Sequence, residues 1–215
     1  MGTGSLSLLD YRRRVSQLYA DVREAAARRG PREAHELWRT ARDELYASHV
    51  DSPLLLDDPR RRTGLPVAPY DPDLRFTAPV ETADPDEPGH ELRVTTGTDG
   101  EVVFTRLGRA ATPLGTLDLW WLSGYGGGVW LPVRDGSSGT SSYGGGRYLL
   151  DTVKGADLGA VDADDDEQRQ QGQQRLVLDL NFLYNPSCAY DPEWACPLAP
   201  PGNRLEAPVE AGELV

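Results

Sequence analysis

Two similar glycine runs contain residue types suited to binding an anion: SGYGGGVW at 123–130 and SSYGGGRY at 141–148. Backbone N–H groups of consecutive glycines can form a concave anion site, and the guanidinium of Arg147 could clamp a carboxylate or phosphate. Neither run continues as a P-loop. The alternative is that both runs are glycine bends on neighbouring strands. Arg147 would then form a salt bridge with one of three carboxylates: Asp135, Asp151 or Asp179.

A second group of polar side chains lies in the run LVLDLNFLYNPSCAYDPEW at 176–194. If this run is a strand, Asp179 and Asn181 point to the same face, because side chains alternate along a strand. Asp and Asn on one face, with Tyr184 nearby, predict a polar interior or cleft. The alternative is that both side chains hydrogen-bond to loop backbone and hold the tail in place.

Cys188 and Cys196 are separated by seven residues, and three states are open for them. Zinc knuckles space paired ligands by two to four residues, and the histidines are scattered, with His35 expected on the polar side of a helix. The pair could instead form a disulfide, or remain as two buried free thiols. No hydrolase, metalloprotease or dinucleotide-binding motif occurs, so no metal and no cofactor are expected.

Two helices are predicted in residues 5–49, which we take as an N-terminal helical hairpin, residues 1–49. Apolar residues recur there at helical spacing. Gly30 is expected to stop the first helix and Pro31 to start the second. The hairpin is amphipathic and should pack on the rest of the chain.

Residues 50–215 are predicted to form a β domain. From Leu74 onward, short runs alternate apolar and polar residues and are broken by Gly, Pro or Asp. A hairpin turn is expected at 97–101, an exposed polar loop at 162–174, and a Pro-rich tail extended over the surface. The predicted fold is mainly β: an antiparallel barrel or sandwich with the helical hairpin packed on it.

The charge balance excludes some classes of partner. The formal net charge is −12 over 215 residues, with a single lysine, Lys154. An acidic surface disfavours non-specific binding to nucleic acid or to an anionic membrane. No apolar run is long enough to span a membrane, and no secretory signal is apparent, so a cytoplasmic location is expected. Arginine in place of lysine fits either a GC-rich genome or a high-salt, halophilic cytoplasm.

Three blocks together carry a family resemblance: LWWLSGYGGGVWLPVRDGSSGTSSYGGGRYLLD, LDLNFLYNPSCAYDPEWACPLAPPGNRL and AGE. They resemble the DUF1684 family of bacterial and archaeal proteins of unknown function, over residues 36–213. The stretch GSSGTSS at 136–142 departs from the family, which tends to carry a threonine and an acidic residue there. The resemblance implies signature positions at Arg134, Asp135, Tyr143, Gly145, Gly146, Arg147, Tyr148, Asp151, Asp179, Asn181, Tyr184, Asn185, Cys188, Tyr190, Cys196, Pro197 and Asn203.

Three functions remain open from these residues. The first is a β domain that binds a small molecule, with an anionic ligand as one option. The second is a hydrolase-like enzyme in which Asp179 is the general acid or base and Arg147 holds an anionic group. The third is a structural or interaction protein whose polar cluster only holds strands and tail together. The predicted ligand-binding residues are Tyr125, Tyr143, Gly145, Gly146, Arg147, Tyr148, Asp151, Asp179, Asn181, Tyr184 and Asn185.

Overall fold

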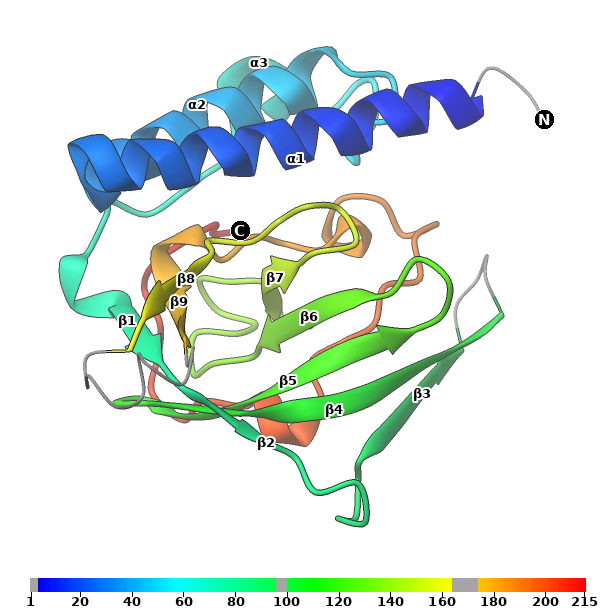
Figure 1. The fold of residues 1–215 in the computed structure, drawn as a ribbon. Coiled ribbons are helices and arrows are strands. Elements are labelled where there is room, and N and C mark those ends of the chain that lie inside the picture. Colours follow the sequence, from blue (N-terminus) through cyan, green and yellow to red (C-terminus); the bar gives the residue numbers. More distant parts are fainter. Residues whose placement is uncertain (1–3, 96–99, 164–173) are drawn as a thin grey trace.

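The computed structural model describes residues 4–95, 100–163 and 174–215 (Figure 1). Helix α1 spans Gly4–Arg29, α2 spans Pro31–Ser48, and the short α3 spans Arg60–Thr63. The predicted break between the first two helices is confirmed: Gly30 has a φ of 100°, a conformation that favours glycine, and Pro31 occupies the first turn of α2. The three helices lie together on one side of the β part.

The strands form two antiparallel sheets. The smaller sheet has the order β1-β9-β8, and the larger has the order β2-β4-β5-β6-β7, with β3 also paired to β4. The smaller sheet consists of β1 (Arg75–Ala78), β8 (Ala160–Asp162) and β9 (Gln174–Asp179). The larger consists of β2 (Val80–Thr82), β3 (Glu91–Thr95), β4 (Glu101–Thr112), β5 (Gly115–Ser123), β6 (Gly128–Val133) and β7 (Arg147–Asp151).

The fold is therefore mainly β with an N-terminal helix pair. Within the described ranges the two sheets do not close into a barrel, so the sandwich alternative fits. The predicted hairpin partners, β3 and β4, pair antiparallel from Glu91↔Thr105 to Thr95↔Glu101. Most of the turn expected at 97–101 and of the loop expected at 162–174 lies outside the described residues.

The helix pair and both sheets share one hydrophobic core. Val22 from α1 and Trp38 from α2 belong to the same buried cluster as Leu131 from β6 and Leu178 from β9. The expectation that the hairpin packs on the β part is confirmed. The expected position of His35 on the polar side of its helix is wrong, because the side chain is buried. One ring nitrogen lies 3.0 Å from the carbonyl oxygen of Asn181, and this hydrogen bond satisfies it in the core.

The strand considered for the run that begins at residue 176 ends early. Strand β9 stops at Asp179, and a 3-10 turn, η2, follows at Leu180–Phe182. The Asp179 carboxylate accepts a hydrogen bond from the backbone nitrogen of Asn181 at 3.2 Å, which caps this turn. Side-chain alternation is lost there, and all three residues of η2 are buried. The predicted shared strand face of Asp179 and Asn181 is therefore wrong.

The C-terminal tail is partly exposed, as expected, but alternate residues of it pack into the core. Two further 3-10 turns, η3 (Ser187–Ala189) and η4 (Pro201–Asn203), precede a tail whose side chains alternate between exposed and buried. Asn203 is fully buried because its amide donates to the carbonyl oxygens of Asp118 at 2.8 Å and Pro132 at 2.9 Å. One side of the tail is therefore part of the interior. Its buried side chains include Leu205, Val209, Ala211 and Glu213.

Candidate functional site

The first glycine run is a bend, as one of the two readings predicts. It connects β5 to β6, which pair antiparallel. A Cβ atom on Gly127 would lie 2.7 Å from the Trp121 ring, so glycine lets the indole pack on the backbone. Tyr125, predicted to line a pocket, is fully exposed at the tip of this bend.

The second run leads into β7 and sets the position of Arg147. Gly146 has a φ of 89°, and a Cβ atom there would lie 2.9 Å from the carbonyl oxygen of Val133. A Cβ atom on Gly145 would lie 2.6 Å from the Tyr143 ring. The chain therefore needs glycine at both positions to bring Arg147 against the tail.

Arg147 is buried, and both terminal nitrogens of its guanidinium donate two hydrogen bonds each. It donates to the Asp135 carboxylate at 2.8 Å and to the carbonyl oxygens of Val209 at 2.9 Å and Glu213 at 3.1 Å. It also donates to the carbonyl oxygen of Ala211. We call Arg147, Asp135 and the backbone of residues 209–213 the Arg147 clasp. Of the three carboxylates expected as its salt-bridge partner, Asp135 is the one it contacts.

The carboxylate of the clasp is held ionised by its neighbours. Burial on its own would raise the pKa of Asp135. Hydrogen bonds from Ser137, the charge of Arg147 and the backbone N–H of Val209 outweigh burial, and the pKa lies below its usual value. The clasp ties β7 to the tail through charge-assisted hydrogen bonds.

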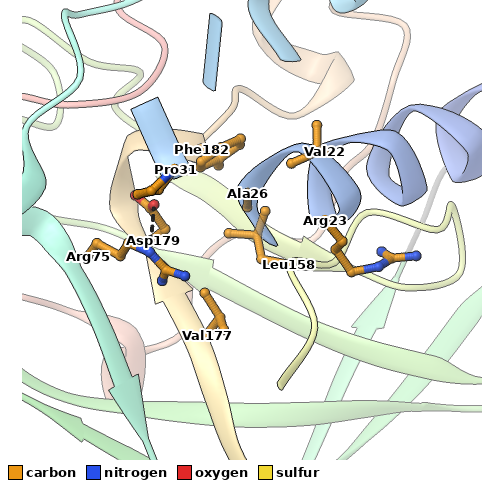
Figure 2. Close-up of a pocket in the computed structure, with 9 residues that line it drawn as sticks. All are labelled: Val22, Arg23, Ala26, Pro31, Arg75, Leu158, Val177, Asp179 and Phe182. Atoms are coloured by element: carbon orange, nitrogen blue, oxygen red, sulfur yellow. Dashed lines mark ion pairs between the residues drawn. The ribbon is translucent and has the colours of Figure 1, made fainter. Parts of the chain in front are cut away.

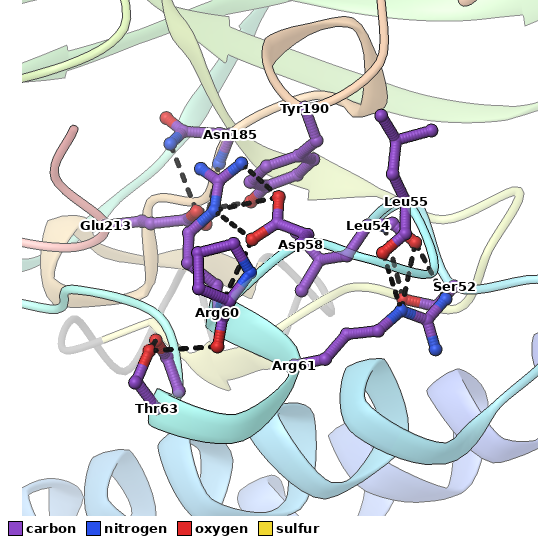
Figure 3. A network of polar contacts seen from close by, with 12 residues as sticks. Ser52, Leu54, Leu55, Asp58, Arg60, Arg61, Thr63, Asn185, Tyr190 and Glu213 are labelled. Carbon is purple, nitrogen blue, oxygen red and sulfur yellow. Dashed lines mark hydrogen bonds and ion pairs between the residues drawn. The ribbon is translucent and has the colours of Figure 1, made fainter.

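Other predicted residues belong to separate contacts. Figure 3 shows Asn185 beside Glu213, whose Oε1 atom accepts a hydrogen bond from the Asn185 amide at 3.1 Å. Asp151 accepts a hydrogen bond from Lys154 at 2.7 Å. Tyr148 and Tyr184 are paired through their backbones, with N···O distances of 2.8 and 3.0 Å.

Asp179 lies in a different group of contacts. Its Oδ1 atom accepts hydrogen bonds from the backbone and the amide of Asn181, and its Oδ2 atom accepts one from the Tyr70 hydroxyl at 3.2 Å. Asn181 in turn brackets the backbone of Asp71, with two contacts of 2.7 Å. Burial raises the pKa of Asp179 above its usual value, although Asn181, Arg75 and Tyr70 oppose this shift.

Asp179 also lines a pocket between the helix pair and the smaller sheet (Figure 2). The guanidinium of Arg75 lies beside it, with 3.8 Å between Nε and Oδ2, which is longer than a hydrogen bond. Arg23 lies on the opposite side and is paired with Asp157 at 3.1 Å. We call this the Asp179 pocket. Its remaining lining is apolar: Val22, Ala26, Pro31, Leu158, Val177 and Phe182.

The Asp179 pocket is shallow. It holds about 260 Å³ of empty space when its open mouth is included, but its cavity volume is about 20 Å³, room for about one water molecule. Of the residues predicted to bind a ligand, Asp179 lines it and Asn181 supports Asp179 from behind. Their role in binding stays a prediction, and the other predicted residues do not line this pocket.

Sequence reasoning did not single out Arg23 or Arg75. Arg75 starts β1 and pairs in register with Asp179, the last residue of β9. The sequence does contain one indication of this pair: an arginine at the start of one predicted strand and an aspartate within another. Cross-strand neighbours of opposite charge attract, but the sequence does not show which strands are neighbours.

Both cysteines are free and half-buried, so neither a disulfide nor full burial is observed. In the described part of the chain, no group of three or more His, Cys, Asp or Glu side chains is placed to hold a metal ion. Within the same ranges, the helices are too polar or too short to cross a membrane.

Comparison with known proteins adds a family and a fold. A family model described as a protein of unknown function, DUF1684, matches residues 61–214. The solution NMR structure of an uncharacterized protein from Haloarcula marismortui is similar, with 28% sequence identity and a TM-score of 0.55. The match covers 82% of this chain and 90% of that chain. No curated protein matches.

Proposed function

This chain belongs to the DUF1684 family, whose function is unknown, and from its own geometry we propose that it binds a small zwitterion, such as an amino acid with a short aliphatic side chain. The Asp179 pocket is the proposed site. The observation that carries the proposal is the placement of Arg75 and Asp179 side by side against an apolar wall, with 3.8 Å between them.

The charges of the pocket favour a ligand with one group of each sign. Within the described residues, the Arg75 guanidinium makes no hydrogen bond, so its donors are free for a ligand carboxylate. Asp179 Oδ2 accepts one side-chain hydrogen bond, from Tyr70, and can accept another from a ligand ammonium group. A zwitterion placed between them adds no net charge to a partly buried site, whereas a simple anion would meet the carboxylate of Asp179.

The apolar wall limits the size and polarity of the ligand's side chain. Val177, Leu158 and Phe182 face the pocket and offer contact to a few carbon atoms. The small cavity leaves little room behind them, so a ligand of amino-acid size would lie across the mouth. A short aliphatic group fits these limits better than an aromatic or phosphorylated one.

A structural role is the second candidate, and the Arg147 clasp favours it. Arg147 and Asp179 have no hydrogen-bond partner in common among the described residues. A hydrolase-like mechanism that uses Asp179 as acid or base together with Arg147 therefore has less support than either binding or structural support. The ligand-binding proposal is assigned to Arg75 and Asp179.

Thermal-shift screening tests the proposal. The panel would contain glycine, alanine and valine, with propionate and propylamine as probes that carry one charge each, all at equal ionic strength. We expect a zwitterion to raise the melting temperature, because a ligand that binds the folded state stabilises it. The single-charge probes should raise it less.

Three variants decide where binding occurs. Arg75→Gln and Asp179→Asn should each abolish the shift, while Arg93→Gln, at an exposed position on β3, should keep it. If propionate binds and Asp179→Asn tightens it, the ligand is a simple anion and the zwitterion proposal is wrong. If no probe shifts the wild-type protein, or all variants respond alike, binding at this pocket is refuted.

A further inference from the structure

Two cysteines and a tyrosine meet at the start of the C-terminal tail. Cys188 lies in η3, after Pro186, and Cys196 directly precedes Pro197. The backbone N–H of Cys188 donates to the sulfur of Cys196 at 3.3 Å. The Tyr143 hydroxyl lies 3.6 Å from the sulfur of Cys188. Both cysteines are half-buried, so a small molecule can reach them.

One end of this segment is anchored to the core, and the other is closed by a local turn. The Tyr148 hydroxyl donates to the carbonyl oxygen of Pro197, next to Cys196. On the other side, Ala189 donates to the carbonyl oxygen of Pro186 at 2.9 Å, which closes the turn that holds Cys188. These two hydrogen bonds hold the backbone next to each cysteine.

The surroundings of Cys188 favour its thiolate. The Cys196 thiol and the Tyr143 hydroxyl hydrogen-bond to its sulfur, and they lower the pKa of Cys188 to about 6 despite partial burial. The same interaction raises the pKa of Cys196. One thiolate beside one thiol is the state expected of an attacking and a resolving cysteine, since the thiolate is the nucleophile.

We propose that Cys188 and Cys196 form a dithiol redox site that reduces low-molecular-weight disulfides, with Cys188 as the attacking and Cys196 as the resolving sulfur. The site shares no residue with the Asp179 pocket and is independent of the function proposed above. Tyr143 is a positioning residue that supports the thiolate.

The reaction balances in two exchanges. Cys188 as thiolate attacks one sulfur of a disulfide R–S–S–R, forming a mixed disulfide and releasing R–S⁻, which takes up a proton from solvent. Cys196 then loses its proton and attacks the sulfur of Cys188, releasing the second R–S⁻, which is protonated in turn. The chain is oxidised from two thiols to one disulfide, and R–S–S–R is reduced to two R–SH. Excess small thiol reverses both steps.

Oxidised glutathione is the probe for this proposal. Reduced full-length protein is incubated with it, quenched in acid, alkylated and analysed by mass spectrometry. We expect an intramolecular disulfide between the peptides that contain Cys188 and Cys196, with no glutathione retained. Two retained glutathiones on the wild-type chain, or no reaction, would overturn the proposal.

Single variants assign the two roles. Cys196→Ser should retain one glutathione on Cys188, because the resolving sulfur is gone. In Cys188→Ser only Cys196 can react, and at pH 6 it should react about tenfold more slowly than Cys188 does in Cys196→Ser, since an ordinary thiol is almost fully protonated there. Equal rates and equal products for the two variants would refute the assignment.

The hydroxyl of Tyr143 gives a test that does not remove a sulfur. Tyr143→Phe should keep the final disulfide but shift the pH midpoint of iodoacetamide alkylation at Cys188 upward from about 6. Tyr125→Phe, at a fully exposed position, is the matched control and should leave the midpoint unchanged. An unshifted midpoint in Tyr143→Phe would show that the tyrosine does not support the thiolate.

Discussion

Two pairs in this molecule each consist of one arginine and one aspartate, but their surroundings differ. In the Arg147 clasp, Nη2 of Arg147 lies 2.8 Å from Asp135, and both side chains are at most 1% exposed. In the Asp179 pocket, Nε of Arg75 lies 3.8 Å from Asp179, and the arginine side chain is 27% exposed. Arg147 makes four hydrogen bonds to one carboxylate and three carbonyl oxygens. Arg75 makes none within the described residues.

The comparison shows how a structural ion pair differs from one that can accept a ligand. A buried guanidinium whose two terminal nitrogens are both occupied by protein acceptors offers little to another molecule, and it ties its neighbours together. A guanidinium held near a carboxylate, but outside hydrogen-bond distance, keeps its donors available. Burial of the aspartate does not distinguish the two pairs, since both aspartates are buried.

The largest expected difference is in stability after loss of each arginine. Arg147→Met leaves Asp135 buried without its counter-charge and leaves three carbonyl oxygens without a donor. It should lower the free energy of unfolding by about 3–5 kcal/mol. Arg75→Met should lower it by about 1 kcal/mol or less, because the pair is long and partly exposed. Urea titrations of both variants measure this difference.

The matched comparison also controls for the methionine side chain, which is the same in both variants. If both variants lose similar stability, the two pairs do not differ in the way described above. If Arg147→Met is as stable as the wild-type protein, the clasp does not hold the tail.

An intermediate loss of stability is expected when Gly146, the glycine that precedes Arg147, is replaced. Gly146→Ala forces an L side chain into a φ of 89° and places its Cβ atom 2.9 Å from the carbonyl oxygen of Val133. The loss should be about 2 kcal/mol by urea titration. Gly144→Ala is the control: its Cβ would have no neighbour closer than 3.6 Å, and its φ is not positive. Equal losses for the two variants would show that Gly146 is not specifically required.

Local backbone rules predicted much of the fold from the sequence. Gly30 and Pro31 mark the helix break, and the glycine run at 126–128 marks the bend between β5 and β6. Both depend on the conformational limits of glycine and proline, which act within a few residues. The alternating runs also predicted that the fold is mainly β.

The candidate site was harder to predict because it depends on contacts between distant segments. Arg75 and Asp179 are far apart in the chain and meet because β1 pairs with β9. The cap formed by Asp179 turned the expected strand into a 3-10 turn, which local alternation could not show. The tail was expected on the surface because it is rich in proline, yet the clasp and Asn203 anchor alternate residues of it in the core.

The smallest expected effect is the opposite pH dependence of the two carboxylates. Asp135 has a folded-state pKa below the ordinary value of 3.8, so it stabilises the fold above that value, and this stability is lost as the pH falls through its folded pKa. Asp179 has a folded-state pKa above 3.8, so its ionisation costs stability at neutral pH, and stability returns as the pH falls toward 3.8. Free energies of unfolding in urea, measured across mildly and strongly acidic pH, should therefore flatten above 3.8 in Asp179→Asn and below 3.8 in Asp135→Asn. Because the readout is a slope, a uniform loss of stability in Asp135→Asn does not affect it. Identical slopes in the two variants would mean that the clasp and the pocket hold their carboxylates in the same way.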